Sequence, residues 1–331
     1  MKSFLIIQTA FIGDVILATS IIEKLHKFYP DAKIDFLLRK GNESLLSNHP
    51  YINNLIIWNK KSKKYKHLFN ILALVRKQKY DYVINLQRFA TTGFITSFSK
   101  AKNRIGFAKN PFSIFFTKRI KHSIKEGLHE VDRNTRLIKH ITDEQSMRPK
   151  LHPSVLDFDH VSKYKNTEYI CIAPTSVWFT KQFPAKRWIE FINQIQTNLT
   201  VYLLGAKSDF VACEKIQSQC KGVNVINLAG KISLIESAAL INDAKMTYVN
   251  DSAPLHIASA MNSPVAAIFC STVTDFGFGP LSEKSTVIQT HKKLSCRPCG
   301  LHGRKNCKIR SFECANSIDI NEMLNLLKKE Y

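Results

Sequence analysis

The sequence predicts an α/β protein made of two domains, each with a mostly parallel sheet between layers of helices. Its 331 residues, 44% of them hydrophobic, suffice for two cores of about 150 residues each. Apolar runs of strand length alternate with amphipathic stretches of helix length along almost the whole chain. Residues 146–166, which contain Pro149 and Pro153 and have no sustained period, are predicted to link the domains.

The first half opens with a strand over residues 4–7. The helix that follows is marked by apolar residues at helical spacing, namely Val15, Leu17, Ala18, Ile21, Ile22 and Leu25. The same criteria predict strands at 33–38, 54–58, 81–86 and 104–107, and helices at 65–78, 91–99 and 128–141.

The alternation resumes after the linker. Strands are predicted at 168–173, 201–204, 223–227, 246–250 and 265–269, and helices at 185–196, 209–220, 234–243 and 254–261. Neither half carries a G-x-G-x-x-G or a G-x-x-x-x-G-K-[ST] motif. This argues against a dehydrogenase and against a P-loop NTPase.

Positive charge is concentrated in the first half. The chain has 48 Lys and Arg against 26 Asp and Glu, and residues 1–150 hold 28 of the basic and 11 of the acidic residues. Such asymmetry points to a polyanionic partner, which can be nucleic acid, an anionic membrane surface or a phosphorylated substrate. A solvated lysine-rich surface is the plain alternative for any single run of lysines.

The first residues superficially resemble a signal peptide. Gln8 and Thr9 interrupt the apolar run after a strand's length, and Asp14 falls where a cleavage region is uncharged. We therefore expect a soluble intracellular protein, in which the eight cysteines are thiols or metal ligands rather than disulfides.

Three segments at predicted strand ends can carry chemistry. Residues 9–14 end in Gly13 and Asp14 at the start of a helix, where Asp14 is either a catalytic group or a simple N-cap. Residues 173–181 place hydroxyls and Lys181 ahead of a helix, a pattern suited to a diphosphate. Residues 250–256 run from a strand into a helix with Pro254 in its first turn; a capped helix with a buried His256 is the plain alternative.

These segments resemble, in order and separation, glycosyltransferase family 9, the ADP-heptose:lipopolysaccharide heptosyltransferases. The resemblance rests on T-x-x-x-G-D at 9–14, Asn85-Leu86-Gln87 with Arg104-Ile105-Gly106-Phe107, A-P-x-S-V-W-x-T-K at 173–181 and N-D-S-A-P-L-H-I-A at 250–258. It implies a GT-B fold, with two Rossmann-like domains facing a cleft. Residues 1–155 would bind the acceptor, and residues 166–331 the nucleotide-sugar.

The resemblance also implies an inverting, metal-independent enzyme that transfers heptose from ADP-heptose to a phosphorylated lipid acceptor of the lipopolysaccharide core. Asp14 matches the base that deprotonates the acceptor hydroxyl. The residues that match or adjoin the donor site are Ser176, Thr180, Lys181, Asp209, Asp251, Ser252 and His256. Thr175 and Ala253 stand where the family commonly has glycine, which bears on donor choice.

Such an enzyme would be cytoplasmic and peripheral to the inner face of the bacterial inner membrane. Its acceptor phosphates or the anionic membrane surface would then meet a lysine run in the first half, made of Lys60, Lys61, Lys63 and Lys64. No cofactor is expected for catalysis, and no nucleic-acid partner.

Four cysteines lie within 19 residues, namely Cys296, Cys299, Cys307 and Cys314. They can enclose a structural zinc ion, remain free thiols or form redox-sensitive pairs. Two other functions stay open from the residues alone. A nucleic-acid-binding protein would fit a pI near 9.7 but lacks a recognisable module, and a non-catalytic sugar-nucleotide-binding module would not need Asp14.

Overall fold

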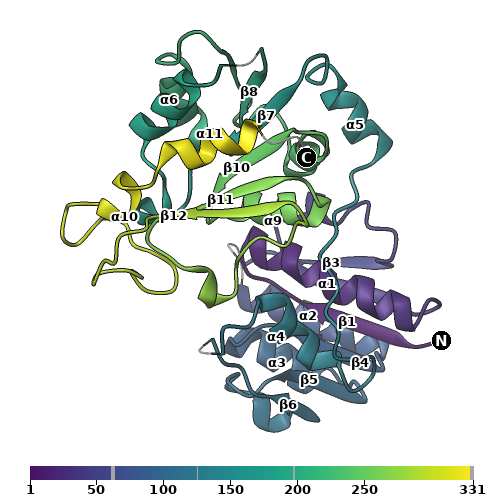
Figure 1. Ribbon diagram of the computed structural model, residues 1–331. Helices are drawn as coiled ribbons and strands as arrows, with labels where there is room; N and C mark the ends of the chain where they lie inside the picture. Colours follow the sequence, from purple (N-terminus) through teal and green to yellow (C-terminus); the bar gives the residue numbers. More distant parts are fainter. Residues whose placement is uncertain (61–63, 125, 197, 329–331) are drawn as a thin grey trace. The chain divides into compact units, whose positions relative to one another are not determined.

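The structure, a computed structural model, describes residues 1–60, 64–124, 126–196 and 198–328. It divides into two compact units, Met1–His152 and Pro153–Tyr331 (Figure 1). Each unit is an α/β layer structure around its own parallel sheet. None of the described helices is long and apolar enough to cross a membrane.

The sheet of the first unit has six parallel strands in the order β3-β2-β1-β4-β5-β6. They are β1 (Ser3–Ile7), β2 (Lys33–Arg39), β3 (Asn54–Trp58), β4 (Tyr82–Asn85), β5 (Asn103–Phe107) and β6 (Lys118–Ile120). The central strand β1 is buried along both faces from Phe4 onward, as expected for a strand covered on both sides by helices.

Helices of the first unit pack in pairs on this sheet. They are α1 (Ile12–Phe28), α2 (Lys64–Gln78), α3 (Ala90–Phe98) and α4 (Glu130–Ile138), with the 3-10 turns η1 (Glu43–Leu45) and η2 (Ser113–Phe115). Helix α1 packs on α4, and α2 packs on α3 (Figure 1). Leu5 and Ile7 of β1 share a core cluster with Trp58 and Val75.

The second unit repeats this topology. Its parallel strands β7 (Tyr169–Ala173), β8 (Thr200–Leu203), β9 (Asn224–Asn227), β10 (Met246–Asn250), β11 (Val265–Phe269) and β12 (Ser285–Gln289) lie in the order β12-β11-β10-β7-β8-β9. Numbered within each unit and read from either edge, the two sheets have the same strand order. In both, the order reverses between the first and the fourth strand, which is the usual ligand-binding point of such sheets.

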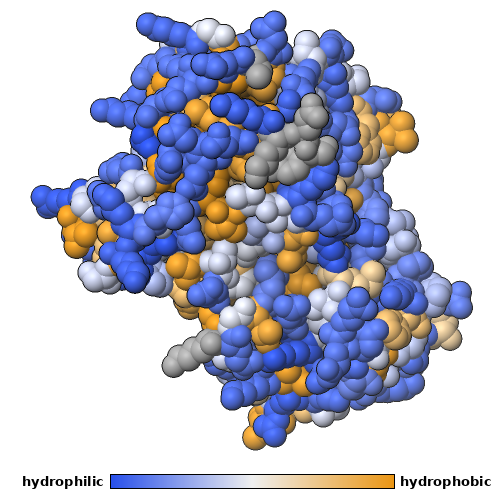
Figure 2. Space-filling view, in the orientation of Figure 1, coloured by the Kyte–Doolittle hydropathy of each residue, from blue (hydrophilic) through white to orange (hydrophobic). Residues whose placement is uncertain are grey.

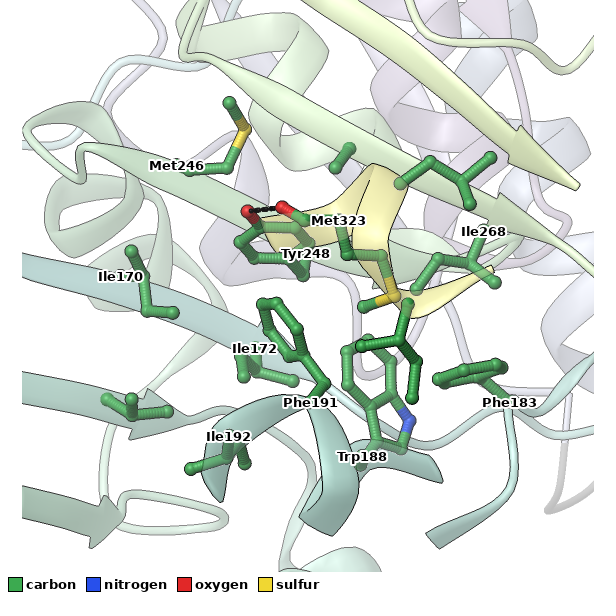
Figure 3. Close-up of a cluster of buried hydrophobic side chains, with 14 of the residues drawn as sticks. Ile170, Ile172, Phe183, Trp188, Phe191, Ile192, Met246, Tyr248, Ile268 and Met323 are labelled. Atoms are coloured by element: carbon green, nitrogen blue, oxygen red, sulfur yellow. Dashed lines mark hydrogen bonds between the residues drawn. The ribbon is translucent and has the colours of Figure 1, made fainter. Parts of the chain in front are cut away.

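The helices of the second unit are α5 (Val155–Ser162), α6 (Ala185–Asn193), α7 (Phe210–Gln217), α8 (Leu234–Asn242), α9 (Ala253–Met261), α10 (Glu313–Asn316) and α11 (Ile320–Lys328), with turns η3 (Phe179–Lys181), η4 (Lys207–Asp209) and η5 (Thr274–Phe276). Figure 3 shows the core between α6, α11 and the sheet, where Trp188 and Phe191 lie beside Tyr248. The Tyr248 hydroxyl donates to the carbonyl of Met323 at 2.8 Å, so it fixes α11 to β10.

The predicted elements of both halves are present, with ends shifted by a few residues, but five further helices and strands of the described residues were not predicted, namely β6, α5, β12, α10 and α11. The segment 146–166 is not a featureless linker, because it contains α5, whose first turn is capped by Ser154 and Asp157. The strands β6 and β12 are short edge strands with half-exposed patterns, which leave little apolar periodicity in the sequence.

Candidate active site

The predicted site segments lie at the reversal points of the two sheets. In the first unit, the loop after β1 leads to Asp14, and the neighbouring strand β4 ends at Asn85 and leads to Gln87 and Arg88. In the second unit, the loop after β7 leads to Lys181, and the neighbouring β10 leads to Asp251. Each sheet therefore presents a pair of polar loops at the carboxyl ends of adjacent strands.

Asp14 is half-buried in the first turn of α1. Its Oδ2 accepts a hydrogen bond from the backbone N–H of Phe11 at 3.2 Å, so the capping role and a polar site role coincide in one residue. Burial raises the pKa of the Asp14 carboxyl above its ordinary value, against the opposing effects of the Phe11 N–H, Arg88 and Arg39. A carboxylate of raised pKa is a stronger base than a solvated one.

Charged groups that the sequence did not single out surround Asp14. Arg88 contacts His122 through Nη1 and Nδ1 at 3.4 Å, and burial next to Arg88 lowers the pKa of His122 to about 4. Glu130 is buried and pairs with Arg133 Nε at 2.8 Å. Burial raises the pKa of Glu130. Arg88 directly follows the Asn85–Gln87 strand end, so its position in the sequence was the available signal.

Lys60 is held against the same loop. Its Nζ donates to the hydroxyl of Thr9 at 2.8 Å and to the Thr9 carbonyl at 3.1 Å, and lies over the Trp58 ring. Thr9 in turn donates to Gln87 at 3.1 Å. Lys60 therefore belongs to the edge that carries Asp14. Of the rest of the predicted lysine run, Lys61 and Lys63 lie outside the described residues and Lys64 begins α2.

Lys181 and Asp251 form the centre of the corresponding edge in the second unit. Lys181 Nζ lies 2.7 Å from Asp251 Oδ2, and the side chains are only 14% and 8% exposed. The same oxygen accepts from the hydroxyl of Thr272 at 2.6 Å, at the end of the next strand, β11. One largely buried site thus holds an ammonium, a carboxylate and a hydroxyl.

The loop that carries Lys181 is braced from two sides. Thr180 is buried, and its hydroxyl accepts from Ser271 at 2.9 Å and from the backbone N–H of Arg304 at 2.8 Å. Asn250 accepts from the backbone N–H of Phe183 at 2.9 Å. Ser176 is half-buried, and its carbonyl accepts a hydrogen bond from the side chain of Gln182 at 2.6 Å. The Thr180 hydroxyl is therefore engaged in hydrogen bonds within the protein.

The remaining predicted donor residues sit at helix starts. Ser252 is the N-cap residue of α9, and Pro254 follows in its first turn. His256 is buried in the same helix. Asp209 precedes α7, and its carboxylate accepts from the backbone N–H of Ala206 at 2.8 Å. Neither Thr175 nor Ala253 has a positive φ, so the side chains at these two positions bring no backbone strain.

The cysteine segment packs on this edge without forming a metal site. Arg297 donates to the carbonyls of Cys270 and Thr272 at 2.8 Å each, and the N–H of Cys299 donates to Ser271. No three of the sulfurs of Cys296, Cys299, Cys307 and Cys314 come within 4.8 Å of one another in the described residues, so they do not fit a tetrahedral ion as placed. Burial and the neighbouring thiols raise the pKa of Cys314 to about 11.

A different cluster, in the first unit, brings three possible ligand atoms within 4.8 Å: Glu23, His49 and His152. The N–H of Tyr51 donates to His49 Nδ1 at 3.4 Å, which assigns the proton of neutral His49 to Nε2, facing Glu23 at 3.5 Å. His152 lies 3.2 Å from the same carboxylate. The hydrogen bond between His152 and Glu23 ties α1 to the end of the unit, whereas His49 Nε2 is buried without a hydrogen bond to any described residue.

Comparison with known proteins identifies the family. The model of "Glycosyltransferase family 9 (heptosyltransferase)" matches residues 69–308. Lipopolysaccharide heptosyltransferase 3 of Escherichia coli is 30% identical over 279 residues, covering 79% of this chain and 82% of that protein. Lipopolysaccharide core heptosyltransferase OpsX of Haemophilus influenzae is 25% identical over 342 residues, covering 99% and 96%.

Solved structures agree on the fold. The E. coli ADP-heptose lps heptosyltransferase II has a TM-score of 0.81 and 22% identity, covering 99% of this chain and 98% of that chain. The GT-B class of two Rossmann-like domains is thereby confirmed. The nucleic-acid-binding and non-catalytic alternatives receive no support from these matches. The chain is a glycosyltransferase, and it belongs to glycosyltransferase family 9, the heptosyltransferase family.

Proposed function

We propose that this protein transfers a heptose from ADP-heptose to a phosphorylated acceptor of the lipopolysaccharide core. The observation that carries the proposal is the Lys181–Asp251–Thr272 group at the reversal point of the second sheet. The Lys181 ammonium and the N-terminus of α9 both offer positive charge to phosphate oxygens, which suits a nucleoside diphosphate. Relatives named as lipopolysaccharide heptosyltransferases supply the sugar and the acceptor class.

We assign the acceptor to the first unit and the donor to the second. Asp14 acts as the base that removes the acceptor hydroxyl proton as that oxygen attacks the anomeric carbon and the ADP leaves. One base with one site for the leaving diphosphate accounts for inversion at the sugar carbon. Lys181 offsets the charge that develops on the diphosphate, so the reaction needs no metal ion.

The other residues have supporting roles in this proposal. Asp251 orients Lys181 and accepts from sugar hydroxyls, Ser252 and the α9 amides hold phosphate oxygens, and His256 supports them. Asp209 and Ser176 lie on the nucleotide side. Thr180 acts indirectly, since its hydroxyl fixes the loop that carries Lys181.

Lys60 takes the acceptor side in this scheme, because its ammonium is fixed beside the Asp14 loop. Lys61, Lys63 and Lys64 follow it in the chain and are assigned to acceptor phosphates or to an anionic membrane surface, which would make the enzyme peripheral to the cytoplasmic face of the inner membrane. A structural zinc in the cysteine segment would need its four thiols to draw together, and metal analysis of the purified protein decides whether it is present.

A donor screen tests the proposal. Thermal unfolding is followed with ADP-heptose, UDP-sugars and GDP-sugars at equal concentration, since a ligand that binds the native state raises the midpoint in proportion to the logarithm of its concentration over Kd. We expect the largest rise with ADP-heptose, followed by release of ADP on addition of a heptose-deficient core acceptor. A larger rise with a UDP- or GDP-sugar, or no ADP release, contradicts the proposal.

A further inference from the structure

Five phenylalanines and one isoleucine gather on one flank of the first unit, on α2, α3 and the η2 segment. We name this group the aromatic patch; its members are Phe69, Phe94, Phe98, Phe112, Ile114 and Phe115. Phe94 of α3 is central, with ring centroids 6.0 Å from Phe69, 4.9 Å from Phe98 and 5.9 Å from Phe112. Phe115 closes the group at 6.0 Å from Phe98.

The patch is open to solvent. Ile114 is 72% exposed, Phe69 59% and Phe115 53%, and Phe98 is exposed as well. Figure 2 shows hydrophobic residues reaching the surface among hydrophilic ones at the end of the first unit that carries β6. Scattered apolar residues are ordinary on a protein surface, but large rings in mutual contact mark a surface that another apolar phase covers.

The patch is held in place from beneath. Asn110 donates to the carbonyl of Phe89 at 3.0 Å and accepts from the N–H of Phe112 at 2.9 Å. Gly93 of α3 packs directly on it, since a Cβ there would lie 2.0 Å from Asn110 Oδ1. Ser97 donates to the carbonyl of Phe112 at 3.2 Å. These contacts lock α3 to the η2 segment, so the rings are presented together.

Two arginines stand at the rim. Arg76 Nε donates to the carbonyl of Phe98 at 2.7 Å, and Arg104 Nε donates to the carbonyl of Phe115 at 3.1 Å. Each guanidinium is thus tied to the backbone of a patch residue. Cations fixed around exposed rings are the arrangement by which a protein meets phosphate headgroups with its charges and acyl chains with its apolar side chains.

Charge selects the partner. Residues 64–121, the segment that supplies all patch residues, contain 13 lysines and arginines and a single acidic residue, Asp81, which pairs with Lys102. A second copy of the chain would bring the same positive rim against this one, so self-association through the patch is opposed. An anionic bilayer offers negatively charged phosphates to the arginines and, below them, an apolar interior to the rings.

We propose that the aromatic patch docks this protein on an anionic lipid bilayer, with Phe69, Ile114 and Phe115 entering the interface and Arg76 and Arg104 at the phosphates. This deepens the proposed function, because it names a surface by which the enzyme would reach a lipid-linked acceptor. The docking itself needs neither Asp14 nor Lys181, so it is tested separately from transfer.

The experiment is cosedimentation of the full chain with vesicles of phosphatidylglycerol and phosphatidylcholine (1:1) and with pure phosphatidylcholine, at low and high salt. The variant is Ile114→Ser/Phe115→Ser, and the matched control is Leu156→Ser/Val211→Ser, which removes two exposed apolar side chains of the second unit. We expect the patch variant to lose about tenfold or more of its partition into the anionic vesicles, given the apolar area removed. The control keeps wild-type partition.

Further measurements on the same proteins test the proposal. Weaker binding of the wild type in high salt, and to neutral vesicles, supports the arginine rim. Transfer to a water-soluble, deacylated acceptor stays at the wild-type rate in the patch variant; its loss would place the patch in the catalytic unit and overturn the proposal. The proposal is also overturned if the patch variant binds vesicles as the wild type does. A wild-type dimer that the patch substitutions dissociate would identify the patch as a self-association surface instead. Tighter binding of the wild type to a single-stranded oligonucleotide than to vesicles would identify a nucleic acid as the partner.

Discussion

Lys181 Nζ lies 2.7 Å from Asp251 Oδ2, and this contact joins the loops that leave two adjacent parallel strands. A largely buried ion pair contributes little net free energy to folding, because the Coulomb attraction mainly offsets the loss of hydration. In the proposed donor site, Lys181 would therefore exchange Asp251 for a diphosphate at small cost. On this proposal, Asp251 orients the ammonium in the absence of donor, and the charge of Lys181 becomes available when donor binds.

Lys181→Met should weaken donor binding and slow transfer together. In the proposed mechanism the ammonium contacts the diphosphate both in the bound donor and in the transition state. We therefore expect Kd for ADP-heptose to rise about 10- to 100-fold and kcat/KM to fall at least as far. Isothermal titration and ADP release measure the two effects. Lys245→Met, which removes the half-buried partner of Glu168, is the control. Unchanged donor affinity in Lys181→Met would remove this residue from the donor site.

Gly303→Ala should impair the donor site from within the cysteine segment. At φ +73 its Cβ would lie 3.0 Å from Thr180 Oγ1 and 3.1 Å from Lys181 Cγ. Gly300 is the matched control, because its φ is +80 and a Cβ there meets nothing within 4 Å. Both variants lose about 1 kcal/mol from the positive φ, but only Gly303→Ala should also raise Kd for donor. Equal donor affinity in both would show that the segment does not position Lys181.

Sequence reasoning located the strand ends well, because each depends on a local pattern. Asp14, Lys181 and Asp251 follow short apolar runs and precede helices, and parallel strands bring such ends to one edge. The family resemblance then suggested their roles. The edge strands β6 and β12 and helix α5 were missed, since they carry few buried residues and little periodicity. Helices α10 and α11, which follow the cysteine segment, were not predicted either.

The surroundings of these residues were not predictable in the same way. The effect of Arg88 on Asp14, the hydrogen bond from Lys60 to Thr9 and the packing of Gly303 on Lys181 all join residues that are distant in sequence. Such contacts follow from tertiary packing rather than from local propensity. The aromatic patch likewise needs α2, α3 and η2 to be packed side by side before its rings meet.

The stability of the protein should fall between neutral pH and pH 5 partly through His49. Burial, with His152, His26 and Lys150 nearby and against the attraction of Glu23, lowers the pKa of His49 to about 4. The unfolded chain binds a proton near its ordinary pKa of about 6.5, so His49 opposes folding increasingly as the pH falls through that window. Its upper limit is about 3 kcal/mol, from about 1.4 kcal/mol for each pKa unit.

The variant His49→Gln measures the contribution of His49 to the pH dependence of the free energy of unfolding. Urea unfolding at pH 7.5 and pH 5 gives the free energy of unfolding of both proteins, and we expect the wild type to lose more stability over that interval than the variant. His67→Gln is the control, since His67 is a half-buried histidine near the start of α2 and lies outside the Glu23–His49–His152 cluster. Equal losses in wild type and His49→Gln would refute the contribution.

Asp14 should be the group that sets the acid limb of the pH–rate profile. Burial raises its pKa, so transfer is present above that raised pKa and is lost as the pH falls through it. Asp14→Asn should lower kcat by about 10²- to 10⁴-fold, remove the acid limb and leave Kd for ADP-heptose nearly unchanged.

Because Arg88 lowers the pKa of Asp14, Arg88→Met should move the acid limb to higher pH. Arg136→Met, which removes an exposed partner of Glu126, should leave the limb in place. An Asp14→Asn enzyme that turns over normally, or an acid limb that Arg88→Met leaves where it was, would show that another group is the base.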